Sequence, residues 1–244
     1  MELLLHSLFL QHMLQIGIAH STNALGIKNI IEACQLGAVH SCVEDGLCLL
    51  NILQAAKTLP NILFVDVYLP TIDGALVTKI IKLKHPNIKI VGIHTADDDI
   101  TIATMLFAGA DGYVWQYDLG SIIPHCIQHI DHDPVYLDSR LGLVRLYQLY
   151  QRRCQYLCKC AEVIAQYKLT PAEQKFLALS ASQLPYHTIA MLLHVTTKTL
   201  HTYFYRITQK LPVTNRQELT VFSLQYGLSI ITNHITKEMA MLNA

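Results

Sequence analysis

The chain has 244 residues, of which 52% are hydrophobic and only 15% are charged. This length allows one large domain or two of ordinary size, and the composition excludes a disordered or fibrous protein. The net charge is zero, but residues 1–133 carry six Lys and no Arg against 13 acids, whereas residues 134–244 carry 12 Lys or Arg against five acids. An acidic half joined to a basic half predicts two domains with different partners, the basic one suited to nucleic acid.

The amino terminus carries a short apolar stretch, MELLLHSLFLQH, with no positively charged segment and no small-residue cleavage site. It is not typical of a signal peptide, and it is too short to span a bilayer. Residues 1–12 are interpreted as an extension from an upstream start or as an extra packing element. No other segment has 18 uninterrupted apolar residues, so no membrane contact is predicted. The seven Cys lack the regular spacing of a secreted disulfide framework, which favours a reduced, cytoplasmic protein.

The acidic half alternates apolar strands with amphipathic helices. Strands are predicted over 14–19, 62–67, 88–93 and 112–115, and helices over 24–36, 46–57, 74–84, 99–108 and 119–130. Continuous apolar strands between amphipathic helices indicate a parallel sheet covered on both faces, and right-handed crossovers make it doubly wound. Functional groups are then expected at the C-terminal ends of the strands.

Asp66 lies at such a strand end, before the turn residues Pro70, Asp73 and Gly74. Around it the chain resembles the receiver domain of bacterial response regulators of the NarL/FixJ group. The segments that carry the resemblance, with the family's mutual spacing, are FVDVYLPTIDG (64–74), HPNIKIVGI (85–93) and AGADGYVW (108–115). The resemblance implies a flavodoxin-like receiver fold, with Asp66 at the phosphoacceptor position and Tyr113 as the aromatic switch.

The residues around Asp66 differ from those that receiver chemistry uses. The resemblance implies two adjacent acids after the first strand, which would hold a Mg²⁺ ion that prefers about six oxygen ligands. Here that region has the sequence IGIAHST (16–22), so the pair is His20 and Ser21 or, in the other register, Ile18 and Ala19. Neither pair contains a carboxylate.

Two further family positions are also changed. Gln116 stands where the resemblance implies a Lys, and His94, or Thr95 after a shift of register, stands where it implies a Thr or Ser. We therefore predict a pseudo-receiver that holds no metal or cofactor and is not switched by ordinary Mg-dependent phosphorylation. The alternatives are a pH-linked or ligand-linked switch at His20, His94 and Asp66, an unknown partner at the receiver, or polar loop residues without function.

A boundary follows at residues 129–140, where acids, His and a Pro are mixed. Leu and Tyr at helical spacing over 140–167, with Arg interleaved, then predict an amphipathic linker helix that could pair with a partner helix. Cys154 and Cys158 share a face of this helix and Cys160 points elsewhere, which is not the paired spacing of a zinc site. These three Cys are interpreted as small apolar filling, with a metal or redox role as the alternative.

The basic half opens with a strong helix start, in which Thr170 is the N-cap, Pro171 takes the first helical position and Glu173 completes a capping box. Further helices are predicted over 185–193, 198–210 and 215–229. Thr196 or Thr197 can cap the second of these. Two short helices joined by a tight turn and followed by another helix are typical of a helix-turn-helix domain.

Residues 168–228 resemble the LuxR-type DNA-binding domain through LTPAEQKFL, TIAMLLHVTTKTLHTY, ITQKLPVTNRQEL and YGL, in the family's order and spacing. The start of the helix after the turn is expected to meet the major groove. The DNA-binding candidates are Lys198, Thr199, His201, Thr202, Tyr205 and Arg206, with Lys210 as a phosphate contact. The core positions predicted by periodicity are Ile189, Ala190, Leu193, Val195, Leu200, Phe204, Ile207 and Leu211. The alternative is that the polar residues only solvate a helix face.

These observations predict an α/β receiver-like domain over 1–133, a linker helix over 134–167 and an all-α helix-turn-helix domain over 168–244. They favour a cytoplasmic transcription regulator of the two-component type, a homodimer on double-stranded DNA, since two recognition helices face two half-sites. The alternative is a protein–protein adaptor whose recognition helix no longer binds DNA. The sequence contains no Gly-rich phosphate loop and no plausible catalytic set, so no enzyme is predicted.

Overall fold

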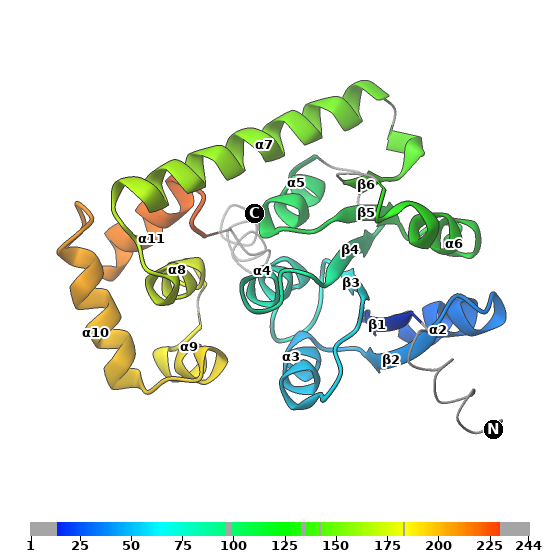
Figure 1. Cartoon of the computed structure of the whole chain (residues 1–244), viewed down its shortest axis with the longest axis horizontal. Helices are drawn as coiled ribbons and strands as arrows, with labels where there is room; N and C mark the ends of the chain where they lie inside the picture. Colours follow the sequence, from blue (N-terminus) through cyan, green and yellow to red (C-terminus); the bar gives the residue numbers. More distant parts are fainter. Residues whose placement is uncertain (1–13, 96–98, 133–134, 142, 183, 230–244) are drawn as a thin grey trace, which may run out of the picture. The chain divides into compact units, whose positions relative to one another are not determined.

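The computed structural model describes residues 14–95, 99–132, 135–141, 143–182 and 184–229 (Figure 1). Contacts divide the chain into two compact units, Met1–Leu143 and Val144–Ala244. Each unit has its own set of buried apolar side chains. The interpretations of residues 1–12 concern a segment outside the described residues.

The first unit is a six-stranded sheet in the order β2-β1-β3-β4-β5-β6, and every neighbouring pair is parallel. Its strands are β1 (Gln15–Ala19), β2 (Ala38–Val43), β3 (Ile62–Asp66), β4 (Lys89–His94), β5 (Gly112–Trp115) and β6 (Tyr136–Leu137). Its helices are α2 (Ala24–Ala33), α3 (Gly46–Ala55), α4 (Gly74–Lys84), α5 (Asp99–Ala108) and α6 (Leu119–His129). Helices α2 and α6 pack on one another, and so do α3 with α4 and α4 with α5, as Figure 1 shows. The predicted doubly wound parallel sheet is confirmed.

The sequence does not predict β2 and β6, the two strands at the edges of the sheet. In β2, His40 and Ser41 interrupt the apolar pattern, and Ser41 is the one buried residue of this strand. β6 is only two residues long, and it pairs Tyr136 with Gly112 beyond the predicted end of the receiver domain. An edge strand does not need the continuous apolar run of a central strand, so its sequence signal is weak.

Helix ends also differ from the prediction by a few residues. The helix predicted over 24–36 ends at Ala33, because Gln35 adopts a left-handed φ of 51°. The helix predicted over 215–229 ends at Gln225, because Gly227 adopts a φ of 72°. A left-handed residue cannot continue a right-handed helix, so these two positions set the limits.

The core of the first unit is built from the central strands. Phe64 of β3 and Tyr113 of β5 are among its largest fully buried side chains. The ring of Tyr113, predicted as an aromatic switch, therefore lies inside the fold. On the face covered by α2 and α6, the buried side chains include Ile16, Ile18, Phe64, Val91, Ile93, Ile27, Ile31, Ile123 and Cys126.

The second unit is all-α. Its helices are α7 (Leu143–Gln166), α8 (Pro171–Ala178), α9 (Tyr186–Leu193), α10 (Thr197–Thr208) and α11 (Arg216–Gln225). The capping box of Thr170 and Glu173 forms as predicted, and Thr196 rather than Thr197 caps α10. α10 packs against α8 and α9, which is the predicted helix-turn-helix arrangement.

The predicted core positions of the helix-turn-helix domain and the predicted packing role of the three Cys on α7 are confirmed only in part. Ile189, Ala190, Leu200, Ile207 and Leu211 are buried as predicted. The residues that are only half-buried are Leu193, Val195 and Phe204. Cys158 on α7 is exposed, so it does not fill an apolar gap, whereas Cys154 and Cys160 are half-buried. Along the described part of the chain, we find no helix with both the length and the apolar character needed to cross a membrane.

Gly74 offers a test of how the fold holds the Asp66 strand end. A Cβ atom at Gly74 would lie 2.0 Å from the backbone oxygen of Asp66, because α4 starts directly against β3. We expect Gly74→Ala to lower the free energy of unfolding by about 1–3 kcal/mol or more, since the backbone must move to relieve the overlap. The measurement is urea unfolding of the full chain.

Gly120→Ala is the matched control. Gly120 lies inside α6, and a Cβ atom there would meet nothing within 4 Å. Ala is preferred to Gly in a helix by about 0.5–1 kcal/mol, so this variant should be slightly more stable than the parent. Equal effects of the two substitutions would contradict the packing described for Gly74.

Candidate functional site

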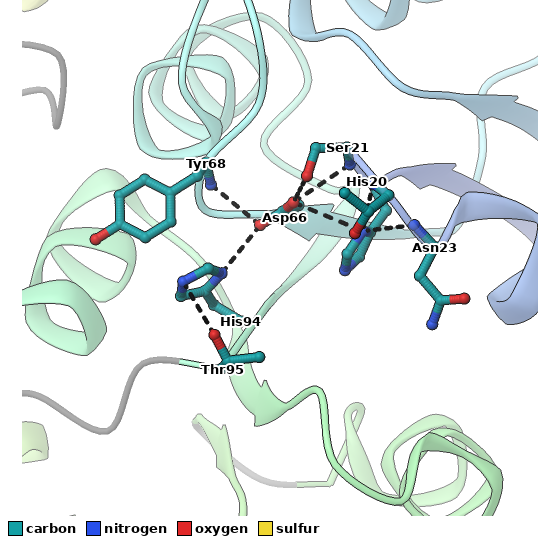
Figure 2. Close-up of polar contacts among 8 residues, drawn as sticks. His20, Ser21, Asn23, Asp66, Tyr68, His94 and Thr95 are labelled. Carbon is teal, nitrogen blue, oxygen red and sulfur yellow. Dashed lines mark hydrogen bonds and ion pairs between the residues drawn. The ribbon is translucent and has the colours of Figure 1, made fainter.

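Asp66 lies where three parallel strands end together. It is the last residue of β3 and pairs with Ile93 of β4, next to His94 at the end of β4. β1 ends at Ala19, so His20 and Ser21 emerge at the same edge of the sheet. Figure 2 shows these side chains pointing toward the carboxylate, which is only 2% exposed.

Four hydrogen bonds occupy the two carboxylate oxygens of Asp66. The backbone N–H of Tyr68 donates to Oδ1 at 3.1 Å, and Nδ1 of His94 donates to the same oxygen at 3.3 Å. The Ser21 hydroxyl donates to Oδ2 at 2.5 Å, and the Ser21 backbone N–H donates to it at 3.2 Å. The protein itself therefore provides the donors that a buried carboxylate needs.

These contacts determine the charge of Asp66. Burial alone would raise the pKa of this carboxyl, but the hydrogen bonds from His94 and Ser21, the nearby His20 and the Tyr68 amide lower it to about 2. Hydrogen bonds to the charged form stabilise the carboxylate over the acid. Asp66 is thus ionised across the physiological pH range.

His20 has a different environment, although it lies 3.6 Å from Asp66 Oδ2 through its Nδ1 atom. That Nδ1 accepts hydrogen bonds from the backbone N–H groups of Thr22 at 3.3 Å and Asn23 at 3.2 Å, so it carries no proton. The side chain is 1% exposed, and burial lowers its pKa, with His94 acting in the same direction. The attraction of Asp66 and a contact with Gln116 oppose this shift.

The structure brings most of the predicted pocket residues together. Of the two registers left open for the acid-pair position, His20 and Ser21 approach Asp66, while Ile18 and Ala19 are buried within β1. Thr95 reaches the cluster only through His94, at 3.4 Å. The sequence does not indicate the Tyr68 amide as a partner of Asp66, because any residue type provides a backbone N–H.

This arrangement does not fit a magnesium ion. Mg²⁺ binds oxygen ligands and is reluctant to lose its waters, and Asp66 is the one carboxylate among the clustered side chains. Its oxygens are already engaged with Ser21, Tyr68 and His94. Over the described residues, no group of three or more His, Cys, Asp or Glu could hold a metal ion.

The second candidate site is the outer face of α10. Lys198, His201, Thr202, Tyr205 and Arg206 are exposed there, and Tyr205 presents 65% of its surface. Spacings of three and four residues put Lys198, His201, Thr202 and Tyr205 along one stripe of the helix. Thr199 is half-buried, and it forms part of the cap with Thr196.

His201 contacts an aromatic ring of the neighbouring helix α9. It packs against Tyr186 with 5.2 Å between ring centroids, and the Arg216 guanidinium lies 4.6 Å above the same tyrosine ring. Arg216 also donates to the Leu184 carbonyl at 3.0 Å. The sequence does not show this contact, because it joins residues of three different helices.

Lys210 is engaged within the domain. Its Nζ donates to Glu173 Oε2 at 2.7 Å and to the Lys168 carbonyl at 3.0 Å. Glu173 is itself buried and completes the cap of α8, so Lys210 neutralises a carboxylate that would otherwise be unpaired. These two bonds use two of the three N–H donors of the Lys210 ammonium group, and the side chain is 30% exposed, so its phosphate contact stays a prediction.

Comparison with known proteins agrees with this division of the chain. Residues 19–116 match the response regulator receiver domain, and residues 167–223 match the bacterial regulatory proteins of the luxR family. The response regulator protein VraR of Staphylococcus saprophyticus subsp. saprophyticus is 26% identical over 175 residues, which cover 72% of this chain and 79% of VraR. The transcriptional regulatory protein LnrK of Bacillus subtilis is 26% identical, with 72% of this chain and 81% of LnrK covered.

A solved structure of the RcsB response regulator of Salmonella typhimurium has the same fold. It is 21% identical, covers 86% of this chain and 97% of its own, and gives a TM-score of 0.50. The chain belongs to the NarL/FixJ-type response regulators. This response regulator thus joins a receiver domain, in which Asp66 ends β3, to a LuxR-family domain that exposes one face of α10.

The hydroxyl of Ser21 provides a direct test of the Asp66 site. We expect Ser21→Ala to lower the free energy of unfolding by about 1.5–3 kcal/mol at pH 7, because a buried carboxylate loses a charged hydrogen bond. The folded pKa of Asp66 lies below the unfolded value of ~3.9, so the carboxylate stabilises the fold above that pH. This stabilisation is lost as the pH falls from ~3.9 toward 2, and the cost of the substitution should shrink over the same range.

Ser121→Ala is the control for Ser21→Ala. The Ser121 hydroxyl makes a similar bond to Asp118 Oδ2, 2.6 Å long, but on the exposed surface. We expect a cost below about 0.5 kcal/mol for this variant. A Ser21→Ala cost no larger than that of Ser121→Ala would show that Asp66 does not depend on Ser21.

Proposed function

We propose that this response regulator is a DNA-binding transcription regulator that is not controlled by ordinary Mg-dependent phosphorylation of Asp66. The observation that carries the DNA part is the exposed face of α10 in a LuxR-family domain, with Lys198 and Arg206 as its cations. Positive side chains on a recognition helix meet the phosphates and bases of the major groove; Lys198 stands in the first turn of α10 and Arg206 in its last turn. We assign Lys198, Thr199, His201, Thr202, Tyr205 and Arg206 to this contact.

The hydrogen bonds to both oxygens of Asp66 support the proposal that the receiver is not switched by phosphorylation. A phosphoacceptor has to present an oxygen to the incoming phosphoryl group, but both oxygens of Asp66 accept hydrogen bonds from the protein. Gln116, at the position where we expect the family's Lys, provides no ammonium for the transferred charge. Without a metal ion or that cation, the negative charge of a phosphoaspartate would lack electrostatic stabilisation.

We also propose an oligomeric state and domain boundaries for this protein. A homodimer presents two recognition helices to two half-sites of a pseudo-palindrome, and we propose that it forms without phosphorylation. The sequence predicts the receiver at residues 1–133, the linker helix at 134–167 and the DNA-binding domain at 168–244, in the cytoplasm. We now propose a receiver that continues past 133 to include β6 (Tyr136–Leu137), with α7 (Leu143–Gln166) as the linker helix. The protein acts as a regulator and not as an enzyme.

DNA binding is tested with Lys198→Ala and Arg206→Ala, alone and together, in a gel-shift assay over a range of salt concentrations. Each substitution that removes a phosphate contact should lower the slope of log K against log salt by about 0.9 per monomer. Lys57→Ala is the control, because it removes the same charge from an exposed position in the receiver. Unchanged binding by the double variant would contradict the assigned contact and favour the alternative function, a protein–protein adaptor whose recognition helix no longer binds DNA.

The receiver is tested by adding millimolar Mg²⁺, with and without beryllofluoride. The fluorescence of Trp115, the one Trp of the chain, next to Gln116, reports on the pocket. We expect no saturable change, and we expect sedimentation to show a dimer whether or not beryllofluoride is present. A saturable change that Asp66→Asn abolishes, or a dimer that forms only with beryllofluoride, would contradict the proposed control.

A further inference from the structure

His20 occupies an unusual position at the start of α2. Asn23 is the N-cap of this helix, yet its side chain makes no capping hydrogen bond. The Nδ1 atom of His20 instead accepts from the backbone N–H groups of Thr22 and Asn23. An unprotonated imidazole therefore satisfies the N–H groups of the loop that leads from β1 into α2.

The same nitrogen faces the Asp66 carboxylate. His20 Nδ1 and Asp66 Oδ2 are 3.6 Å apart, and as an unprotonated nitrogen and a carboxylate oxygen they are both acceptors. The donor to that oxygen is now Ser21, through both its hydroxyl and its backbone N–H. Two sets of partners thus compete around one nitrogen atom, and a proton on Nδ1 decides between them.

We propose that His20 is a proton-operated switch at the site where other receivers are switched by a phosphoryl group. When Nδ1 takes a proton from solvent, it can no longer accept from Thr22 and Asn23, and it becomes a donor to Asp66 Oδ2. The loop between β1 and α2 loses its internal acceptor, while the charge of Asp66 is paired by an imidazolium instead of a hydroxyl. This inference rests on the proposed function, because it supplies the input that replaces phosphorylation.

The groups that face His20 come from three strands. Asp66 at the end of β3 favours the proton, His94 at the end of β4 opposes it when charged, and the uncharged Gln116 after β5 favours it. Burial of a ring that is 1% exposed is the largest influence and lowers the pKa of His20. The switch therefore stays in its neutral state at pH 7 and responds only to acid.

The lowered pKa of His20 determines how the stability of the fold changes with pH. In the unfolded chain His20 takes its proton near pH 6.5, but the folded protein resists protonation until a lower pH. Between these two values the unfolded state binds more protons, so this part of the stability is present above pH 6.5 and is lost as the pH falls. The switch thus converts acidification into a loosened β1–α2 loop.

The experiment is a pH titration of the full chain by NMR, from pH 7.5 to 5, that follows the His20 ring and the backbone amides of Thr22 and Asn23. We expect both amides to shift upfield and to lose hydrogen-exchange protection, with the same midpoint as the His20 ring. In Asp66→Asn the midpoint should move to lower pH, because the attracting charge is gone. In His20→Asn, whose carboxamide can accept a hydrogen bond but takes no proton, the amide transition should be absent.

His132→Gln is the control, since it removes an exposed histidine of the same unit and should leave the transition unchanged. The inference is overturned if the Thr22 and Asn23 amides do not follow the His20 ring, or if their transition persists in His20→Asn. Should His20→Asn fail to fold, the parent titration and the Asp66→Asn midpoint still decide. A response of the same amides to beryllofluoride at pH 7.5 would instead overturn the proposed function.

Discussion

The ends of three receiver strands meet around a buried charge, the Asp66 carboxylate, that must be paired. Asp66 is 2% exposed and ionised, and an isolated carboxylate in such a place would cost several kcal/mol. Parallel strands solve this problem by bringing their C-terminal ends to one edge, where the loops after β1 and β3 and the last residue of β4 each provide donors. Ser21, Tyr68 and His94 are those donors, and the close approach of Gly74 to the Asp66 backbone holds the strand end in place.

The pairing of Asp66 by protein groups has a consequence for signalling. In a receiver that works through a metal ion, the carboxylate needs accessible oxygens and neighbouring acids, and the imidazole and hydroxyl groups here use the same space. Because a hydrogen-bonded carboxylate with a pKa near 2 is already stabilised, a phosphoryl group would have to displace those bonds before it gained any of its own. This competition supports the proposal that the site exchanges protons and hydrogen bonds and is not switched by phosphoryl transfer.

The sequence predicts the central part of this architecture and misses its edges. Strands β1, β3, β4 and β5 are apolar nearly throughout because helices cover both of their faces, and that pattern is visible in the residues. β2 is half-exposed and β6 is two residues long, so neither needs such a pattern. The cap of α8 is predicted to the residue, since Thr170, Pro171 and Glu173 interact within one helical turn.

In the candidate sites, too, some features can be predicted from the sequence and others need the structure. Asp66 and its neighbours His20, Ser21 and His94 can be chosen from residue type and strand position, but the choice between two registers needs the sheet. The pairing of Lys210 with Glu173 joins residues 37 positions apart, and the contacts of Tyr186 with His201 and Arg216 join three helices, so neither leaves a local signal. The phosphate contact of Lys210 stays a prediction, but its pairing with the buried Glu173 is visible only in the structure.

Whether protein donors occupy both oxygens of Asp66 can be measured through the ionisation of its side chain. The ¹³C signal of the Asp66 carboxyl, followed from pH 7 downward with and without millimolar Mg²⁺, reports both the pKa and any metal contact. We expect a carboxyl that stays ionised well below pH 3.9, consistent with a pKa of about 2, and a signal that Mg²⁺ does not move. An ordinary pKa, or a shift that saturates with Mg²⁺ at neutral pH, would contradict this expectation.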